Sequence, residues 1–575
     1  MTITTTMLQH SQSELSARGG LVTANHRLAA ETGAAMLAGG GNAVDAAAAA
    51  SFAIGVVEPA MSGMGGRGYM VIYFTRDGSG TVIDGHERAP LGARADMFKV
   101  EDARQVPTQG WGPLVPVVGA ANSTGHLAAA VPGVVGAIAT AHRRYGRLPL
   151  KTVLEPAMAL AEEGFEVSVP LATTIAMNRS RLARFAASAA IFLRNGHPPV
   201  PGDRLVQPDL ARSLRLMAEH GADEFYTGSI ARAIAAEMER AGGLITLRDL
   251  AEFRPRVWER PLAGSYRGHR LLTVPEATGG ITLVQIMNLL EGFDLATLDP
   301  LGACSLHLLL EACRIAFRDR LAVIDDPAFT PVPYAGLGSE AFADARRRII
   351  SRERALEDVT PADPWPYDGD AAAALPGAHA GAWRAGDQDT THFCAVDRDR
   401  TVVSMTQSII DAFGSGVVVP GTGILLNSAM HNFNPVPGQL GSIAPWKRSV
   451  HNGTPVIVLR PDGTPCLAIG GAGGTKIITG VAQILVNVLD RHWKLQDAVE
   501  APRVHNEGWE SQVDGRVPVG VVDELRRMGH SLEVVMPRFA RPGFSRINGI
   551  AAGPDGTLSS GVDPFSDAGA AAVPA

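Results

Sequence analysis

Residues 386–416 read G-D-Q-D-T-T-H-F-C-A-V-D-R-D-R-T-V-V-S-M-T-Q-S-I-I-D-A-F-G-S-G, and this stretch decides the fold predicted for the chain. Two runs within it, residues 391–396 and 401–408, are rich in β-branched and apolar side chains, a composition typical of strands. The charged residues 397–400 between the runs form a candidate turn. The stretch therefore predicts a β-hairpin.

The register of the hairpin decides which side chains are neighbours. If Val396 pairs with Thr401, Thr390 lies opposite position 407 and begins a strand beside the hydroxyls of Thr406 and Ser408. Thr and Ser commonly pair across strands without any role in catalysis. Spacing alone therefore leaves an ordinary pair of strands as the simpler interpretation.

Short motifs follow one another in this part of the chain: D-T-T-H at 389–392, D-R-D-R at 397–400, T-Q-S at 406–408, F-G-S-G at 413–416 and G-I-L-L-N at 423–427. In this order they resemble the γ-glutamyltranspeptidase family of N-terminal nucleophile hydrolases. In that family the first Thr of the T-T-H run is the nucleophile, and self-cleavage before it makes it a chain terminus. The resemblance implies a cut between Asp389 and Thr390, giving a large piece, 1–389, and a small piece, 390–575.

The chemistry of threonine explains why such a cut is useful. A Thr hydroxyl is a weak nucleophile that needs an adjacent base, and a free α-amine with a pKa near ~8 is a suitable base on the same residue. The amine exists only after cleavage, so the uncut precursor is expected to be inert.

The resemblance continues through the earlier part of the chain. Matching motifs are G-N-A-V-D-A at 41–46, V-E-P at 57–59, A-V-P-G at 130–133, Y-G-R-L-P at 145–149, E-P-A at 155–157 and A-F-R-D-R at 316–320. The family's fold is a four-layer αββα sandwich of the α+β class. The resemblance implies this fold for the two pieces together, as one compact unit.

Hydrophobic periodicity predicts the local structure. Apolar residues at helical spacing predict two successive helices separated by G-G-G-N at 39–42, followed by a strand at 69–73. Gly63, Gly65 and Gly68 match G-x-G-x-x-G, but a helix precedes them and a strand follows, which is the reverse of a dinucleotide-binding unit. Further helices are expected at 148–161, 210–220, 230–241 and 301–320. The polar, proline-containing residues 350–386 are expected to be a mobile tail of the large piece.

Composition narrows the possible partners and cofactors. The 575 residues have 46% hydrophobic and 19% charged side chains, a formal charge of −7 and a pI near 6.2, which do not favour nucleic acid or an anionic membrane. A small molecule is therefore the expected partner. The resemblance implies that it is an amide and that the two pieces of one chain assemble, with a higher oligomer left open. Cys304, Cys313, Cys394 and Cys466 are scattered without a C-x-x-C pair, so they are expected to be free thiols, with no metal and no cofactor.

The N-terminal sequence bears on the compartment. Residues 1–20 contain Gln, His, Ser and Glu where a secretory signal needs an apolar core. The cytoplasm is the expected location.

An amide hydrolase also needs donors for the tetrahedral oxyanion. The resemblance implies this role for Gly473 and Gly474, in a glycine turn before a predicted helix, where each backbone donor contributes about 3 kcal/mol. A turn that only allows close packing is the alternative. Thr406 and Ser408 match hydroxyl positions of the family, with Ser408 replacing a usual Thr. His392 is expected to be structural, because a terminal amine removes the need for a His base.

The residues expected to bind the acyl group depart from the family's pattern. The family's carboxylate-binding Arg is replaced by His86, while Arg88 lies two residues further on, and the family's Ser-Ser pair is replaced by His451 and Asn452. These four side chains could still bind a carboxylate.

The positions that bind the substrate's ammonium also differ. Ile410 stands where the family has Asn, and Ala429 and Asn432 stand where a Gln or Glu and an Asp are usual. A desolvated ammonium needs an acceptor or an anion beside it. The sequence therefore predicts a rebuilt acyl pocket that accepts a carboxylate without an ammonium.

Three hypotheses follow from the sequence. The leading one is a self-cleaving amidohydrolase acting on a small carboxylate-bearing amide through an acyl-enzyme, as in the divergent branch that resembles cephalosporin-acylase-like and oxamate-amidohydrolase-like members. The second is a true γ-glutamyltransferase or glutathione hydrolase. The third, from another class, is an unprocessed binding protein without catalysis.

Overall fold

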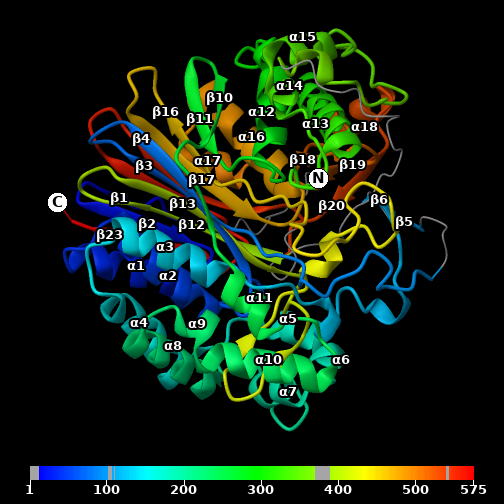
Figure 1. The fold of residues 1–575 in the computed structure, drawn as a ribbon. Helices are drawn as coiled ribbons and strands as arrows, with labels where there is room; N and C mark the ends of the chain where they lie inside the picture. The colour runs from blue at the N-terminus through cyan, green and yellow to red at the C-terminus, as the bar shows by residue number, and fades with distance from the viewer. Residues whose placement is uncertain (1–11, 102–105, 109–110, 370–388, 539–542, 575) are drawn as a thin grey trace, which may run out of the picture.

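The computed structural model describes residues 12–101, 106–108, 111–369, 389–538 and 543–574. Two seven-stranded antiparallel sheets lie face to face between layers of helices (Figure 1). The first sheet has the order β23 (Gly569–Val573), β2 (Gly20–Ala24), β12 (Asp389–Val396), β13 (Val402–Ile410), β3 (Arg67–Phe74), β4 (Ser79–Gly85) and β9 (Arg256–Trp258). The second has the order β1 (Ser16–Ala17), β22 (Leu558–Val562), β21 (Arg546–Ala552), β17 (Pro465–Ala472), β16 (Val456–Leu459), β11 (His269–Thr273) and β10 (Leu262–Tyr266). The predicted αββα architecture is confirmed.

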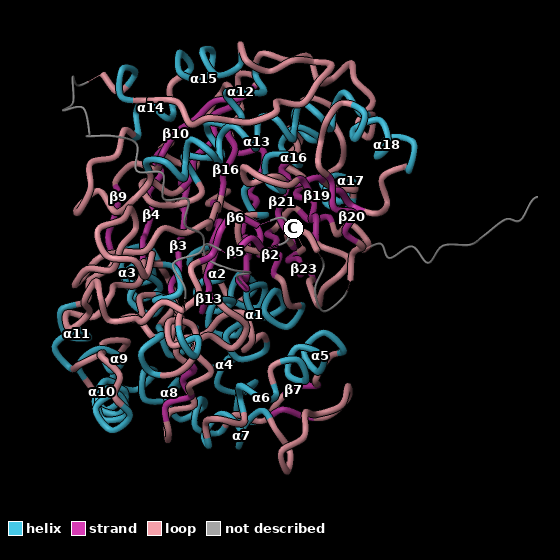
Figure 2. The backbone as a smooth tube through the Cα atoms, turned by 90° about the vertical axis from the view of Figure 1, so that its right-hand side faces the viewer, coloured by secondary structure: helices cyan, strands magenta, loops and turns pink. Residues whose placement is uncertain are grey.

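The helices cover the outer faces of the two sheets. The first sheet is covered by α1 (Arg27–Ala38), α2 (Ala43–Val57) and α3 (Val134–Tyr145), with α4 (Leu150–Glu163) packed on α2. The second is covered by α12 (Gly280–Glu291), α16 (Lys476–Leu489) and α17 (Leu495–Glu500), with α13 (Ala303–Val323) packed on α12. The view turned by 90° again places the strands between these groups (Figure 2). The predicted helices at 148–161, 210–220, 230–241 and 301–320 correspond to α4, α8 (Pro208–His220), α10 (Ser229–Ala241) and α13.

Shorter elements fill the connections. The helices are α5 (Val169–Met177), α6 (Arg179–Leu182), α7 (Ala186–Phe192), α9 (Glu224–Thr227), α11 (Leu247–Glu252), α14 (Tyr334–Gly338), α15 (Glu340–Arg347) and α18 (Val519–Arg527). The strands of the small sheets are β5 (Val106–Thr108), β6 (Trp111–Leu114), β7 (Phe165–Glu166), β8 (Arg204–Leu205), β14 (Val418–Val419), β15 (Ile424–Leu425), β18 (Val504–His505), β19 (Ser511–Asp514) and β20 (Leu532–Val535). Among the helices of the described ranges, none combines the length and apolarity needed to cross a bilayer.

The strands next to the hairpin are buried on both faces. Along β3, Tyr69, Val71 and Tyr73 pack between the two sheets, whereas Met70 and Ile72 pack against the helices. Because successive side chains of a strand point to opposite faces, a sheet enclosed on both sides needs a nearly continuous apolar run. This explains why β3 shows no polar alternation.

The motifs that resemble the family form turns and helix caps that connect helices and strands. Asn42 caps the N-terminus of α2 in a capping box with Asp45, which confirms the predicted break between the first two helices. The Asn42 amide also donates to the carbonyl oxygen of Tyr145, and the backbone N–H of Arg147 donates to Asp45. Asp397, in the hairpin turn, accepts from the backbone N–H of Ala43 at 3.0 Å. The turn is thereby attached to the start of α2.

The hairpin is confirmed, but its predicted register is wrong by one residue. Val396 pairs with Val402 rather than Thr401, because the loop has three residues, 398–400, and Arg400 adopts the left-handed conformation with φ of 60°. Thr390 therefore faces position 408 instead of 407. At this point β13 bulges, so that two residues, 408 and 409, oppose Thr390.

Two further expectations concern the cysteines and the tail. Cys304, Cys313, Cys394 and Cys466 are free, as predicted. Of the tail predicted at 350–386, residues 370–388 lie outside the described residues. In the described part, Ala355 and Val359 are buried, so this part of the tail packs on the body of the protein.

Candidate active site

Thr390 lies near the start of β12 on the face between the two sheets. Its side chain is 5% exposed, and its Oγ1 donates to Oγ of Ser408 at 3.4 Å. The Ser408 hydroxyl donates in turn to the carbonyl oxygen of Asp389 at 2.6 Å, and it accepts from the backbone N–H of Ile410 at 2.8 Å. Ser408 thus connects the Thr390 hydroxyl with the carbonyl of the bond that precedes it.

The backbone after Ser408 is strained. Ile410 has a φ of 80°, a region that a β-branched residue rarely adopts. Its side chain is fully buried in an apolar cluster with Ala130, Ala429 and Phe433. The bulge and this conformation together direct the Ile410 N–H at the Ser408 hydroxyl.

Thr406 is bonded to His392 rather than to Thr390. Its Oγ1 lies 2.9 Å from Nδ1 of His392, whose Nε2 lies 3.2 Å from Sγ of Cys394. The His392 ring occupies the space above Gly470 of the facing sheet, where any side chain would collide with it. Burial lowers the pKa of His392 to about 3, so the ring is neutral at ordinary pH.

Two charged residues outside the predicted set contact Thr390 or its neighbourhood. Arg546, at the start of β21, donates to the carbonyl oxygen of Thr390 at 2.9 Å and to Glu58 at 2.8 Å. Glu58 follows α2 in the V-E-P motif, and burial raises its pKa to about 7 against the opposing effect of Arg546. The sequence signals were a charged residue at the start of a mostly apolar strand, β21, and an acid within a family motif.

Gly473 and Gly474 form the turn between β17 and α16. Their φ angles of 128° and 60° suit glycine, and a Cβ at Gly473 would lie only 3.1 Å from Cα of Ser545. The turn places backbone amides at the N-terminus of a buried helix, where anions are stabilised. Gly473 and Asp389 border the same cavity.

A small cavity of about 10 Å³ adjoins Thr390, close to the space that one water needs. Its lining includes Ser408, Arg67, His451 and Asn452. His451 accepts from the N–H of Gly453 through Nδ1, which leaves Nε2 as the protonated nitrogen of the neutral ring.

Two buried polar atoms of residues that line this cavity, Nε2 of His451 and the hydroxyl of Tyr69, have no hydrogen-bond partner within the described part of the chain. Nε2 of His86, behind them, lies 3.7 Å from Oε1 of Glu87. The His451 ring stacks on Tyr69 with centroids 3.9 Å apart, and the His86 ring meets both edge-on. Burial, followed by the effect of the Arg67 guanidinium, holds the pKa values of His86 and His451 well below the usual range. Both histidines are therefore neutral, and His451 offers its Nε2–H as a donor.

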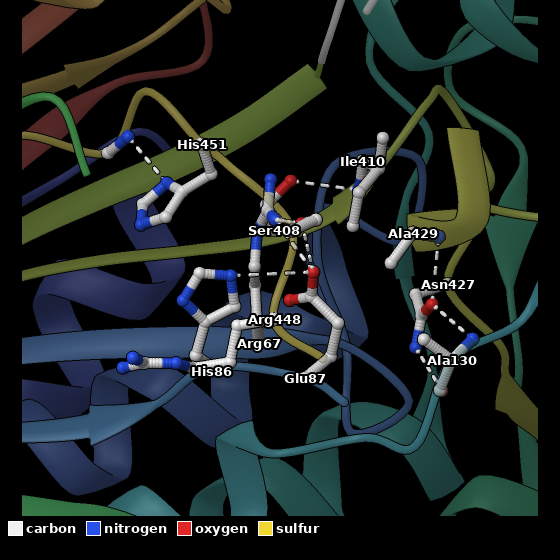
Figure 3. Close-up of polar contacts among 12 residues, drawn as sticks. Arg67, His86, Glu87, Ala130, Ser408, Ile410, Asn427, Ala429, Arg448 and His451 are labelled. Atoms are coloured by element: carbon white, nitrogen blue, oxygen red, sulfur yellow. Dashed lines mark hydrogen bonds and ion pairs between the residues drawn. The ribbon is translucent and has the colours of Figure 1, made fainter. Parts of the chain in front are cut away.

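The positive charge comes from arginines instead. Arg67 lies on β3 opposite Ser408, and it contacts Glu87 at 3.0 Å and Oγ of Ser449 at 3.3 Å (Figure 3). Arg320 on α13 donates to the carbonyl oxygen of His451 and to Oδ1 of Asn452. Among the described residues, no carboxylate forms an ion pair with Arg320.

Sequence reasoning overlooked Arg67 because it sought an arginine at the family's position, now His86. The two residues are cross-strand neighbours, since Gly68 pairs with Gly85. A charged side chain within a glycine run, directly before the buried strand residues 69–73, was the available signal.

Four predicted binding residues, His86, Arg88, Ile410 and Asn432, are not among the residues that line either cavity. Arg88 donates instead to the carbonyl oxygen of Trp446. Ile410 lies beside Ala429, in a loop fixed by Asn427, whose amide bonds both the N–H and the carbonyl of Ala130 (Figure 3). These positions shape the wall of the site rather than its polar lining.

A second cavity of about 570 Å³ borders Asp389 and Gly473. Its lining carries charges of both signs: Arg181, Lys476, Arg546, Asp411 and Glu533. Nδ1 of His431 lies 3.1 Å from Oδ2 of Asp411 at its edge. The two cavities therefore flank the 389–390 bond, one small and rich in donors, the other wide and of mixed charge.

The chain is similar to known proteins over most of its length. The gamma-glutamyltranspeptidase family model matches residues 29–573. The chain is 40% identical over 544 residues to the acylase ACY 1 proenzyme of Pseudomonas sp. strain SE83, covering 94% of this chain and 91% of that protein. It is 34% identical over 515 residues to the glutathione hydrolase proenzyme of Bacillus subtilis strain 168, covering 89% and 85%. The crystal structure of cephalosporin acylase from Bacillus halodurans superposes with a TM-score of 0.86 at 29% identity, covering 100% of this chain and 99% of that chain.

Proposed function

The chain belongs to the γ-glutamyltranspeptidase family, and we propose that it is a proenzyme that cuts itself between Asp389 and Thr390 and then hydrolyses a small carboxylate-bearing amide. The observation that carries the proposal is the contact chain from the Thr390 hydroxyl through Ser408 to the Asp389 carbonyl oxygen. Nucleophile and electrophile are neighbours in sequence, and one side chain bonds both.

The first step is an acyl shift within the chain. Oγ1 of Thr390 attacks the carbonyl carbon of Asp389, its proton passes to Oγ of Ser408, and the Ser408 proton passes to the carbonyl oxygen. Collapse of this intermediate breaks the C–N bond, protonates the nitrogen and leaves an ester between Asp389 and the Thr390 hydroxyl. Water then hydrolyses the ester, which yields a carboxylate on Asp389 and a free amine and hydroxyl on Thr390.

Turnover repeats this chemistry on an external amide. The neutral Thr390 amine takes the hydroxyl proton as Oγ1 attacks, and the backbone amides at Gly473 and Gly474 are the proposed oxyanion donors. Departure of the amine leaves an acyl-enzyme, which water hydrolyses. The 570 Å³ cavity beside Asp389 has room for the leaving group.

The acyl class follows from the small cavity and the residues behind it. His451, which lines the cavity, is neutral, and its Nε2–H lacks a hydrogen-bond partner among the described residues. Arg320, behind His451 and Asn452, donates to neutral oxygens and forms no ion pair within the described part of the chain. Donors and an arginine without a paired acid favour an acceptor that bears negative charge. We infer that this cavity, which has room for about one water, widens on binding, and that Arg67 and Asn452 then hold a carboxylate at the far end of the acyl group.

Glu87 favours a second candidate, hydrolysis of γ-glutamyl amides such as glutathione. Its Oε1 accepts from Arg67 and Ser449, but its buried Oε2 has no hydrogen-bond partner in the described residues. A substrate ammonium could bind this oxygen. The relatives that match at 34% identity include glutathione hydrolase proenzymes.

Two measurements test these proposals. Purified wild type should give two fragments with Thr390 at the N-terminus of the smaller one, and Thr390→Ala should remain one inactive chain. Glutaryl and γ-glutamyl p-nitroanilides then form a matched pair that differs only in the ammonium. Burying an ammonium without acceptors costs several kcal/mol, so kcat/KM should favour the glutaryl amide by about tenfold or more.

Each outcome assigns the activity. A preference of about tenfold for the γ-glutamyl amide that Glu87→Gln abolishes would establish the second candidate. A small fragment beginning at another residue would refute the nucleophile. A single uncut wild-type chain without amidase activity would support the third hypothesis, an unprocessed binding protein without catalysis.

A further inference from the structure

The carbonyl of Thr390 is held by an ion pair that the chemistry above does not use. One guanidinium nitrogen of Arg546 donates to this oxygen at 2.9 Å, and the other lies 2.8 Å from Oε1 of Glu58. Both side chains are nearly buried, at 11% exposure each. Glu58 is fixed at the end of α2, and Arg546 opens β21, so the pair joins the large piece to the small piece beside the nucleophile.

We propose that the Arg546–Glu58 pair positions Thr390 and controls how readily the amine that cleavage creates on this residue takes up a proton. This inference rests on the proposed cleavage between Asp389 and Thr390. It assigns positioning roles to Arg546 and Glu58, since neither contacts the Asp389 carbonyl that is attacked during cleavage.

The distances favour a direct electrostatic effect. The nitrogen and the carbonyl oxygen of one residue are separated only by Cα and the carbonyl carbon, so the Arg546 guanidinium lies within about 6 Å of the Thr390 nitrogen. A cation at this range disfavours a protonated amine, whereas an anion favours it. Arg546 therefore keeps the amine in its basic form. Glu58, one ion-pair distance further away, moderates this effect when it is ionised, which its pKa of about 7 places in the upper part of the pH range.

Other charged groups face the same space from neighbouring elements. Arg67 lies beyond Ser408 on β3, Arg181 lies on α6 and Lys476 begins α16, while Asp389 and Asp411 are acidic groups of the wide cavity. Asp563 and Asp567 act on Arg546 and Glu58 from the C-terminal segment, and His392 is neutral. Cleavage releases Asp389 from its bond to Thr390. Of these groups, Arg546 is the cation bonded to Thr390 itself.

The pH dependence of kcat/KM tests the proposal, because its acidic limb reports the free enzyme's base. Arg546→Met should raise the midpoint of this limb by about one pH unit, and Glu58→Gln should lower it, while Arg546→Lys should restore most of the wild-type value. Arg267→Met is the matched control. Arg267 also pairs with a carboxylate, Asp490 at 2.6 Å, and donates to a backbone carbonyl oxygen, that of Glu291 at 2.7 Å, but its bonds do not reach Thr390 or Arg546. It should leave the midpoint unchanged.

The outcomes separate this inference from the proposed function. If Arg546→Met stays uncut, Glu58→Gln and Arg546→Lys supply the midpoints, and the amine of their small fragments can be titrated directly by its rate of acetylation. Midpoints within about 0.2 units of wild type in all cleaved variants would overturn the role of the pair. A wild type without an N-terminal Thr390 would instead overturn the proposed function.

Discussion

Replacing Ser408 by alanine should slow self-cleavage far more than it harms folding. In the precursor, the Ser408 hydroxyl donates to the Asp389 carbonyl oxygen at 2.6 Å, where negative charge develops during attack. Loss of one such donor costs about 3 kcal/mol of transition-state stabilisation, which corresponds to a rate about 100- to 200-fold lower. The proton path from Thr390 is lost as well, so this figure is a lower bound.

The same substitution has a smaller effect on stability. The buried N–H of Ile410 loses its acceptor at 2.8 Å, which costs about 1–3 kcal/mol of unfolding free energy. Because Thr390→Ala is expected to block cleavage, comparing Thr390→Ala with Thr390→Ala/Ser408→Ala in urea separates stability from processing.

The assay is a time course of precursor conversion after cell-free synthesis, read as two bands on a denaturing gel. Ser408→Thr is the matched control, because it keeps the hydroxyl and should cleave within about tenfold of wild type. Conversion of Ser408→Ala within about threefold of wild type, with normal stability, would refute the role given to this hydroxyl.

Two further predictions concern stability. Ile410→Gly should be less destabilising than Ile410→Ala by about 1 kcal/mol in urea unfolding, the reverse of the usual order, because only glycine relieves the φ of 80°; equal or reversed losses would argue against strain at this position. Burial lowers the pKa of His392 from 6.5 to about 3, so the unfolded chain binds a proton below pH 6.5 that the folded chain does not, and stability should fall by about 1.4 kcal/mol per pH unit between these values. In a pH series of unfolding curves, His392→Gln should reduce the slope of unfolding free energy against pH by about 1.4 kcal/mol per pH unit, the contribution of one proton. An unchanged slope would contradict the neutral, buried ring.

Regular periodicity made most of the fold predictable. The break between α1 and α2 follows from Gly39 and the capping box of Asn42, and the helices α4, α8 and α10 follow from their amphipathic spacing. The hairpin register did not follow, because the loop residue in the left-handed conformation is Arg400, whose side chain gives no signal of a positive φ. A one-residue slip in a loop moves every cross-strand partner.

The site was predictable where it lies on one hairpin and obscure where it is assembled from distant segments. Thr390 and Ser408 meet as expected because they share adjacent strands. Glu58 and Arg67 reach the site from the segment between α2 and β3, and Arg546 reaches it from the start of β21, and a linear pattern contains no information on such contacts. The neutral state of His86 and His451 likewise depends on burial, which only the packed structure reveals.

The order of strands in the first sheet has a consequence for the lifetime of the protein. Strands β2, β3, β4 and β9 come before the proposed cut, and β12, β13 and β23 come after it. Strands of the two groups pair directly with one another, because β23 pairs with β2, β2 with β12, and β13 with β3. The precursor folds as a single molecule, whereas two cut fragments that unfold must find each other again by diffusion, at a rate that falls with dilution. Self-cleavage therefore turns a reversible fold into one whose persistence is set by the height of its unfolding barrier. A dilute sample of the mature enzyme, once denatured, should regain its activity more slowly than a concentrated one.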